Sequence, residues 1–117
     1  MTRLPSLFLI SASLIFGPLA VAETKPGDIN NGKRLFERNG CYQCHGHAGQ
    51  GGLAGARLAQ TKQSQAGFQA YVRNPRSGMM PPFRTKVMSD QDLADVYAYI
   101  KTFPEPNAAK DIPLLEP

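Results

Sequence analysis

The pentapeptide Cys41-Tyr42-Gln43-Cys44-His45 constrains this chain more than any other stretch, and it holds the only two cysteines among 117 residues. Two thiols three positions apart, followed directly by a histidine, are the pattern of a c-type haem attachment site. One turn of backbone carries both sulfurs, so each thiol can form a thioether with one of the two vinyl groups of the porphyrin. We therefore expect one covalent haem c, with Cys41 and Cys44 as its tethers and His45 as an axial iron ligand.

Other uses of these residues fit the sequence less well. A thioredoxin-like redox pair is expected in a βαβ context, and no strand pattern lies near Cys41. A zinc site would use Cys41, Cys44, His45 and His47. The neighbours Cys44 and His45 would then have to ligate one metal together, and the usual second ligand cluster is absent from the sequence. A plain disulfide between the two cysteines stays open as a haem-free alternative.

The first 22 residues predict a cleaved signal peptide. A short basic start ending at Arg3 precedes a mostly apolar run over 7–16, and Ala20-Val21-Ala22 forms a small-residue cleavage site. The apolar run is shorter than the ~20 residues that span a bilayer, so no stable membrane insertion is expected after cleavage. The mature chain from Glu23 is expected in the periplasm, because bacteria attach c-type haem outside the cytoplasm.

The remaining chain predicts one domain over 23–104 and an extended, proline-rich tail over 105–117. A core of this size stabilises a fold only modestly, and a covalently tied apolar cofactor would add buried surface. The net charge of +4 is spread along the chain. Nucleic-acid binding usually requires a basic stripe with a recognisable motif, so we expect no nucleic acid. A monomer or small subunit is expected.

Three helices are predicted from capping signals and apolar periodicity. The first follows a cap at Asp28 and runs to about residue 38, the second covers about 64–73, and the third follows a cap at Ser89, with Asp92 completing a capping box. Asp95 is expected, with the acids of the first turn, to suit the positive end of the helix dipole. The apolar faces are predicted to hold Ile29, Leu35 and Phe36, then Phe68, Tyr71 and Val72, then Leu93, Val96, Tyr97 and Ile100.

A glycine-rich loop follows the pentapeptide over 46–55. Glycine suits a backbone that must approach a cofactor closely, so the loop is expected to wrap the haem edge. One of its carbonyls is expected to accept a hydrogen bond from Nδ1 of His45, which turns Nε2 towards the iron. His47, in the same loop, is expected to be exposed to solvent.

A second loop over 76–83 contains Met79-Met80-Pro81-Pro82. A thioether is a soft ligand that suits haem iron, and His/Met ligation raises the reduction potential. The prolines restrict the backbone at Met80, so Met80 is predicted as the second axial ligand, with Met79 as the fallback. The hydroxyl of Tyr71 is a candidate neighbour of a propionate or of the axial sulfur.

These residues resemble the class I cytochrome c family of small bacterial electron carriers. The resemblance covers nearly all of the mature chain, through Gly32-Lys33-Arg34-Leu35-Phe36, 41–46, the Met80-Pro81 loop and the terminal helix over 89–103. It implies an all-α fold of three to four helices around one covalent haem, with His45 and Met80 as ligands. It also implies that the first and last helices cross at Gly32, Phe36 and Tyr97.

The chain departs from the family at two points. Many members have Gly-Pro-x-Leu where this chain has Gly55-Ala56-Arg57-Leu58, so an alanine carbonyl would have to accept from His45. The interval between His45 and Met80 is short, which implies reduced loops and an exposed haem edge.

Two protein ligands would leave the iron no open position, so we expect one-electron transfer and no enzymatic activity of the chain itself. The expected partners are a periplasmic dehydrogenase and an oxidase or another cytochrome, and the chain could be the cytochrome subunit of an oxidoreductase complex. The alternative is an open-site haem enzyme or gas-binding protein, peroxidase-like or cytochrome c′-like. In cytochrome c′ the haem motif lies near the C-terminus, whereas here it lies near the mature N-terminus.

Overall fold

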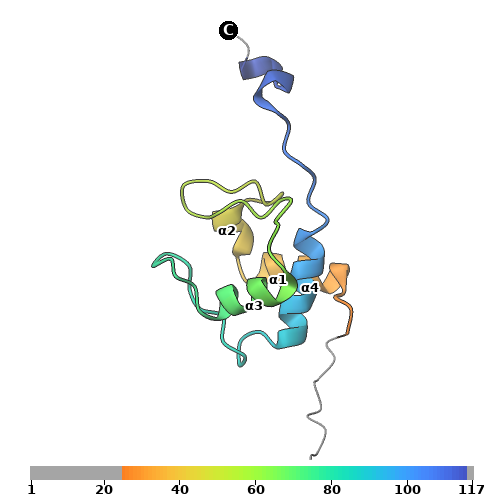
Figure 1. Cartoon of the computed structure of the whole chain (residues 1–117), viewed down its shortest axis with the longest axis vertical. Helices are drawn as coiled ribbons and strands as arrows, with labels where there is room; N and C mark the ends of the chain where they lie inside the picture. Colours follow the sequence, from red (N-terminus) through yellow and green to blue (C-terminus); the bar gives the residue numbers. More distant parts are fainter. Residues whose placement is uncertain (1–24, 116–117) are drawn as a thin grey trace, which may run out of the picture.

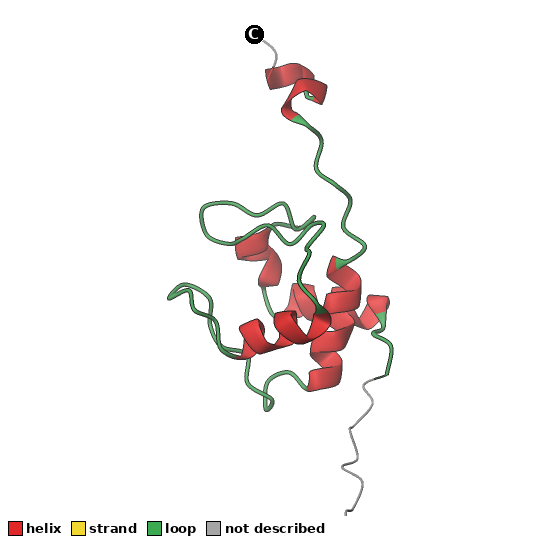
Figure 2. Ribbon diagram, in the orientation of Figure 1, coloured by secondary structure: helices red, strands yellow, loops and turns green. Residues whose placement is uncertain are grey.

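The computed structural model describes residues 25–115, and helices are the only regular secondary structure within that range (Figures 1 and 2). Four α-helices follow in order, α1 (Ile29–Arg38), α2 (Cys41–His45), α3 (Gln65–Arg73) and α4 (Asp90–Ile100). The predicted all-α fold of three to four helices is confirmed. The predicted signal peptide over 1–22 lies outside the described residues.

Each of the three longer helices follows a polar capping residue, and the caps predicted at Asp28 and Ser89 are confirmed. The Asp28 carboxylate accepts from the backbone N–H groups of Asn30 and Asn31 at 2.8 and 3.1 Å. The Ser64 hydroxyl accepts from the N–H of Gly67 at 3.1 Å, and Ser89 forms the expected capping box with Asp92. These bonds satisfy N–H groups that the first turn of a helix leaves without partners.

Helices α1 and α4 cross at Gly32, which is buried. A Cβ at residue 32 would overlap the backbone carbonyl of Asp95, so only glycine lets the two helices approach this closely. Beside the crossing, the Phe36 ring lies 5.6 Å from the rings of both Tyr99 and Phe103. The predicted crossing at Gly32 and Phe36 is therefore confirmed.

The prediction that Tyr97 belongs to this crossing is wrong. Its ring lies 5.6 Å from Phe68 on α3, and its hydroxyl donates to the carbonyl of Gln63 at 2.8 Å. Successive residues turn by about 100° around a helix, so Tyr97 and Tyr99 point to different neighbours. Tyr99 faces α1, and Tyr97 faces α3.

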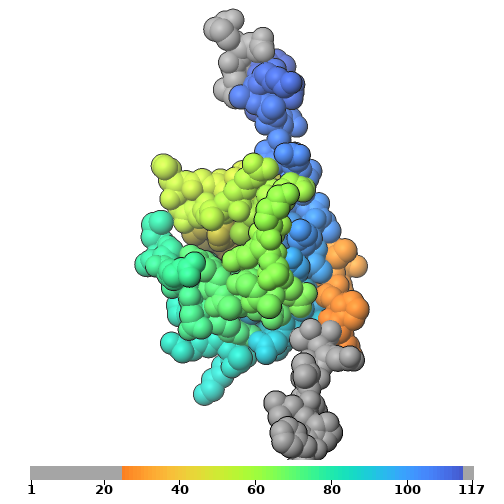
Figure 3. Space-filling view, in the orientation of Figure 1, coloured from red at the N-terminus to blue at the C-terminus, as the bar shows by residue number. Residues whose placement is uncertain are grey.

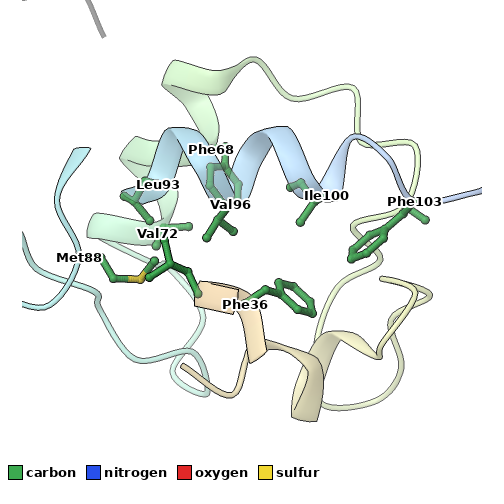
Figure 4. Packing of buried hydrophobic residues seen from close by; sticks show 10 residues of the cluster. Phe36, Phe68, Val72, Met88, Leu93, Val96, Ile100 and Phe103 are labelled. Carbon is green, nitrogen blue, oxygen red and sulfur yellow. The ribbon is translucent and has the colours of Figure 1, made fainter. Parts of the chain in front are cut away.

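The core lies between α1, α3 and α4 (Figure 4). Leu93, Val96 and Ile100 lie along α4 and face Phe36 and Phe68 of the neighbouring helices. Ile29, predicted on the apolar side of the first helix, is 48% exposed instead, because it lies in the first turn, beyond the crossing. The remaining buried apolar side chains are Leu35, Ala59, Val72, Met88, Ala94 and Phe103.

Asp95 is the one buried charged residue within 25–115. Its carboxylate accepts from the Asp28 backbone N–H at 2.9 Å, from Asn31 Nδ2 at 2.6 Å and from Gln91 Nε2 at 2.9 Å. Burial by itself raises the pKa of this carboxyl, but the three hydrogen bonds outweigh it and hold the pKa below its usual value. Asp95 therefore ties α4 to the start of α1, a role beyond the dipole interaction that the sequence predicts.

The C-terminal tail leaves the helical body after Phe103 (Figure 1). It ends in two short turns, η1 (Ala109–Asp111) and η2 (Pro113–Leu115), which contact each other and none of the four α-helices. Leu114 is 95% exposed. The body of the fold is thus built without the tail.

Candidate haem site

The pentapeptide forms the short helix α2, which lies between two residues of positive φ. Gly40 has φ 70° and Gly46 has φ 81°, values that glycine adopts at little cost. Cys41 is half-buried and Cys44 is exposed, and neither is in a disulfide. One helical turn thus presents both thiols, as the haem motif requires.

The haem-free interpretations find little support in this helix. Burial raises the pKa of the Cys41 thiol to about 11, whereas redox-active Cys-x-x-Cys thiols have lowered pKa values. Within 25–115, no group of three or more His, Cys, Asp or Glu side chains is arranged to hold a metal ion. The structure therefore favours neither a thioredoxin-like pair nor a zinc site.

His45 is oriented by the loop that follows α2. Its Nδ1 lies 2.6 Å from the carbonyl oxygen of Ala56, to which the imidazole N–H donates. A donor bond at Nδ1 leaves Nε2 free as a metal ligand. The acceptor is thus an alanine carbonyl, as the sequence predicts.

The glycine-rich loop brings that carbonyl into place by passing close to α2. A Cβ on Gly55 would come within 2.7 Å of the Cys44 carbonyl oxygen. Gly51 has φ 77° and donates its N–H to the His45 carbonyl at 2.8 Å. His47 is exposed, as expected, and its ring stacks on Tyr42 with centroids 4.4 Å apart.

Two adjoining hollows, with cavity volumes of about 230 and 440 Å³, lie between this loop and the loop over 76–83. Figure 3 shows the recess between the yellow-green and the teal segments. Both hollows are lined by Cys41, His45, Ala56, Tyr71, Met80 and Phe83. The inner wall is apolar and includes Phe36, Phe68, Val72, Met88, Leu93 and Val96. Such a slot suits a large, mostly apolar cofactor that keeps one edge near solvent.

The three methionines of the described residues occupy different places around this slot. Met80 is half-buried and lines both hollows, whereas Met79 is 67% exposed and lines only one. Met88 is 2% exposed and belongs to the core. The geometry thus separates Met80 from its neighbour, in line with the preference for Met80 that the prolines indicate.

Tyr71 and Phe83 complete the lining. Tyr71 is half-buried on α3, and the Arg76 guanidinium lies 5.8 Å from the centre of its ring. Phe83 follows the two prolines and reaches both hollows. The motif analysis does not identify Phe83, because a single aromatic residue in a loop has no periodicity that would mark it as a lining residue.

Arg73 is a second residue near the site that the sequence does not identify. Its Nη1 donates to the carbonyl oxygens of Phe83 at 2.6 Å and Met88 at 2.7 Å, and its Nη2 pairs with Asp90 at 2.6 Å. In the sequence it is one of many scattered basic residues. An arginine at the end of a helix and just before Asn-Pro is the only local signal.

The helical fold and the Cys-x-x-Cys-His helix beside an apolar slot define a small class I c-type cytochrome. The chain belongs to the family described as "Cytochrome C oxidase, cbb3-type, subunit III", whose sequence model matches residues 27–100. Proteins of this class bind haem c and use it in electron transfer. The residues present fit that cofactor, since free thiols, an oriented imidazole and an apolar slot lie together.

Several curated proteins are similar to the chain. Cytochrome c-555 of Methylococcus capsulatus is 32% identical over 95 residues, covering 77% of this chain and 76% of that protein. The cytochrome bc1 complex cytochrome c subunit of Corynebacterium diphtheriae is 32% identical over 84 residues, 68% of this chain and 29% of the subunit. Subunit CcoP of the cbb3-type cytochrome c oxidase of Helicobacter pylori is 32% identical over 91 residues, 71% of this chain and 31% of the subunit.

The chain therefore spans less than a third of those two complex subunits and about three quarters of cytochrome c-555. No solved structure matches the chain significantly. In the described part of the chain, no helix combines the length and the apolar character that crossing a bilayer requires.

Proposed function

We propose that this chain is a periplasmic electron carrier with a single covalent haem c, tethered by Cys41 and Cys44 and ligated by His45 and Met80. The observation that carries the proposal is that His45 and Met80 line the same apolar slot, with the His45 imidazole oriented by the Ala56 carbonyl. When bound, the haem supplies a one-electron couple between ferric and ferrous iron.

The chain's own residues provide attachment, ligation and shielding. Cys41 and Cys44 would hold the haem through thioether bonds, each formed by adding a thiol S–H across a vinyl group, so that no leaving group is needed. The Nδ1–H bond to Ala56 keeps the His45 ring from rotating, and Phe36, Phe68 and Val96 exclude water from the inner wall. Rigid ligands limit rearrangement between the two redox states.

The partners are proposed from the relatives. Similar domains occur in proteins named as subunits of bc1 complexes and of cytochrome oxidases. We infer that this chain passes electrons between a periplasmic dehydrogenase and an oxidase or another cytochrome. The signal peptide over 1–22 would export it to that compartment, and recovery of the haem protein from the periplasmic fraction tests this.

Matched methionine variants test the ligation. Met80→Ala is expected to abolish the near-infrared sulfur–iron band of the ferric protein and to lower its midpoint potential, because His/Met ligation raises the potential. Met79→Ala is the control and should change neither. An unchanged band and midpoint in Met80→Ala would contradict the assignment.

Two further measurements test the cofactor. Mass spectrometry of the purified chain should show the mass of the mature polypeptide plus one haem, and a chain without added mass would contradict covalent attachment. Rapid carbon monoxide binding by the reduced native protein would instead favour the open-site alternative.

A further inference from the structure

The segment that carries Met80 has few hydrogen bonds of its own. Between Pro75 and Pro82, all within the described range, the one hydrogen bond is that from the Met79 N–H to the Ser77 hydroxyl at 3.2 Å. A loop with so few internal bonds does not by itself hold a side chain at a fixed place. The hydrogen bonds that tie this segment to the rest of the fold therefore lie at its ends.

At the far end, both the backbone N–H and the backbone carbonyl of Phe83 are hydrogen-bonded. Its N–H donates to the Val72 carbonyl at 3.1 Å, and its carbonyl accepts from Arg73 Nη1 at 2.6 Å. The same Nη1 donates to the Met88 carbonyl at 2.7 Å. We call Arg73 with the carbonyls of Phe83 and Met88 the Arg73 clamp. It ties the loop to the end of α3.

The two residues between Met80 and Phe83 make this tie effective at Met80. Pro81 and Pro82 each fix φ near −65°, and a residue that precedes proline is restricted as well. Met80 and Pro81 both precede a proline. The backbone from Phe83 back to Met80 therefore has little freedom, so that holding Phe83 also restricts the position of Met80.

We propose that Arg73 is the positioning residue for the Met80 sulfur, acting through the Phe83 carbonyl and the stiff Pro81-Pro82 spacer. The inference rests on Met80 being an axial ligand, as proposed above. The Arg73 side chain is only 16% exposed, so its bonds to the carbonyls compete little with water and carry more weight than surface contacts.

Arginine suits this task better than lysine would. Its planar guanidinium lets Nη1 donate to the carbonyls of Phe83 and Met88 while Nη2 pairs with Asp90. A lysine has one compact ammonium group and lacks that planar arrangement. Arg73→Lys therefore keeps the charge and most of the apolar stem but cannot reproduce the clamp.

The test is imidazole binding to the ferric holoprotein, because added imidazole competes with the Met80 sulfur for iron. Arg73→Lys is expected to bind imidazole about tenfold more tightly, since a lost hydrogen bond from a charged group to a buried partner has this order of effect. The near-infrared sulfur–iron band should weaken at the same time.

The matched control is Asp90→Asn, which removes the ion pair and leaves the clamp. The Asp90 side chain is 65% exposed, and such pairs contribute little, so imidazole affinity should stay at the wild-type value. If both variants bind imidazole equally tightly, the ion pair positions the loop and the proposal is overturned. It is also overturned if Arg73→Lys lowers the unfolding midpoint but leaves imidazole affinity unchanged.

If Arg73→Lys yields no holoprotein, Pro82→Ala tests the proposal instead. The proline variant leaves every contact of Arg73 in place. It loosens the spacer and is expected to raise imidazole affinity, and an unchanged affinity would overturn the proposal. A wild-type protein without the sulfur–iron band would overturn the Met80 ligation and this inference together. A wild-type band with unchanged affinity in the variants overturns this inference alone.

Discussion

Gly32 lies directly against the backbone carbonyl of Asp95, where α1 and α4 cross. A Cβ on residue 32 would overlap that carbonyl oxygen and come within 2.9 Å of the Tyr99 Cβ. The obstacle is helix backbone, which cannot turn aside as the end of a side chain can. The two helices can therefore lie this close only because residue 32 has a hydrogen atom where other residues have a Cβ.

Gly32→Ala is expected to destabilise the holoprotein by about 1–3 kcal/mol, the usual cost of overpacking a well-packed interior. The measurement is the urea midpoint followed by circular dichroism. Gly67→Ala is the matched control, because Gly67 also lies in a helix but its Cβ would meet only the side chains of Ser64 and Gln63, at 3.3 and 3.4 Å. An equal loss in both variants would contradict the crossing argument.

Asp95→Asn is expected to lose about 1.5–3 kcal/mol near neutral pH, since three donors face its carboxylate. The pKa of Asp95 is lower in the folded chain than its usual value. Its contribution is therefore fully present above the unfolded pKa and is lost as the pH falls through the folded pKa. The wild type and the variant should differ at pH 7 and converge in strong acid.

Urea midpoints at several pH values measure this difference. The control is Asp111→Asn, because Asp111 is an exposed residue of the tail. This variant should have the same urea midpoint as the wild type at every pH. A gap between Asp95→Asn and the wild type that widens in acid would contradict the assigned sign of the pKa change.

The two tyrosines of α4 face different helices, so matched Tyr→Phe variants measure what each hydroxyl contributes to stability. Tyr97→Phe removes the 2.8 Å hydrogen bond to the Gln63 carbonyl and is expected to cost about 0.5–1.5 kcal/mol. The Tyr99 hydroxyl has no hydrogen-bond partner among the described residues, so Tyr99→Phe should change the unfolding midpoint little. A larger loss in Tyr99→Phe than in Tyr97→Phe would contradict the contribution assigned to the hydrogen bond between Tyr97 and Gln63.

Removal of residues 105–117 is expected to leave the unfolding midpoint and the haem spectrum unchanged, because the two terminal turns contact none of the α-helices. Phe103→Ala is the contrasting variant. Its ring is 5% exposed and lies against Phe36 and Tyr99, so its loss should cost about 3–5 kcal/mol. A truncated chain as unstable as Phe103→Ala would contradict the boundary near residue 104.

Local chemistry made much of this fold predictable. The caps at Asp28 and Ser89 follow from hydrogen bonds within four residues, and the haem motif is a contiguous pentapeptide. Gly32 is also informative. A glycine inside a helix lowers the stability of that helix, so a glycine on the apolar face predicts that another element passes close to it. These features depend on neighbours in the sequence.

Contacts between distant segments were not predictable in the same way. The apolar side chains of α4 pack against both α1 and α3. Periodicity alone does not say which tyrosine faces which of these helices. For Asp95 the sequence predicts only a dipole interaction, because two of its donors, the Asp28 N–H and Asn31 Nδ2, come from the distant start of α1. Arg73 was overlooked since its acceptors are backbone carbonyls, which every residue has.

Helix α2 buries none of its own side chains, although it carries both thiols and the imidazole. Beside it, Phe36, Met88 and Leu93 belong to the apolar inner wall of the slot. Haem bound there would stabilise the folded chain, because a group that binds only the folded state shifts the unfolding equilibrium towards it. We therefore expect a protease to digest the haem-free polypeptide faster than the holoprotein.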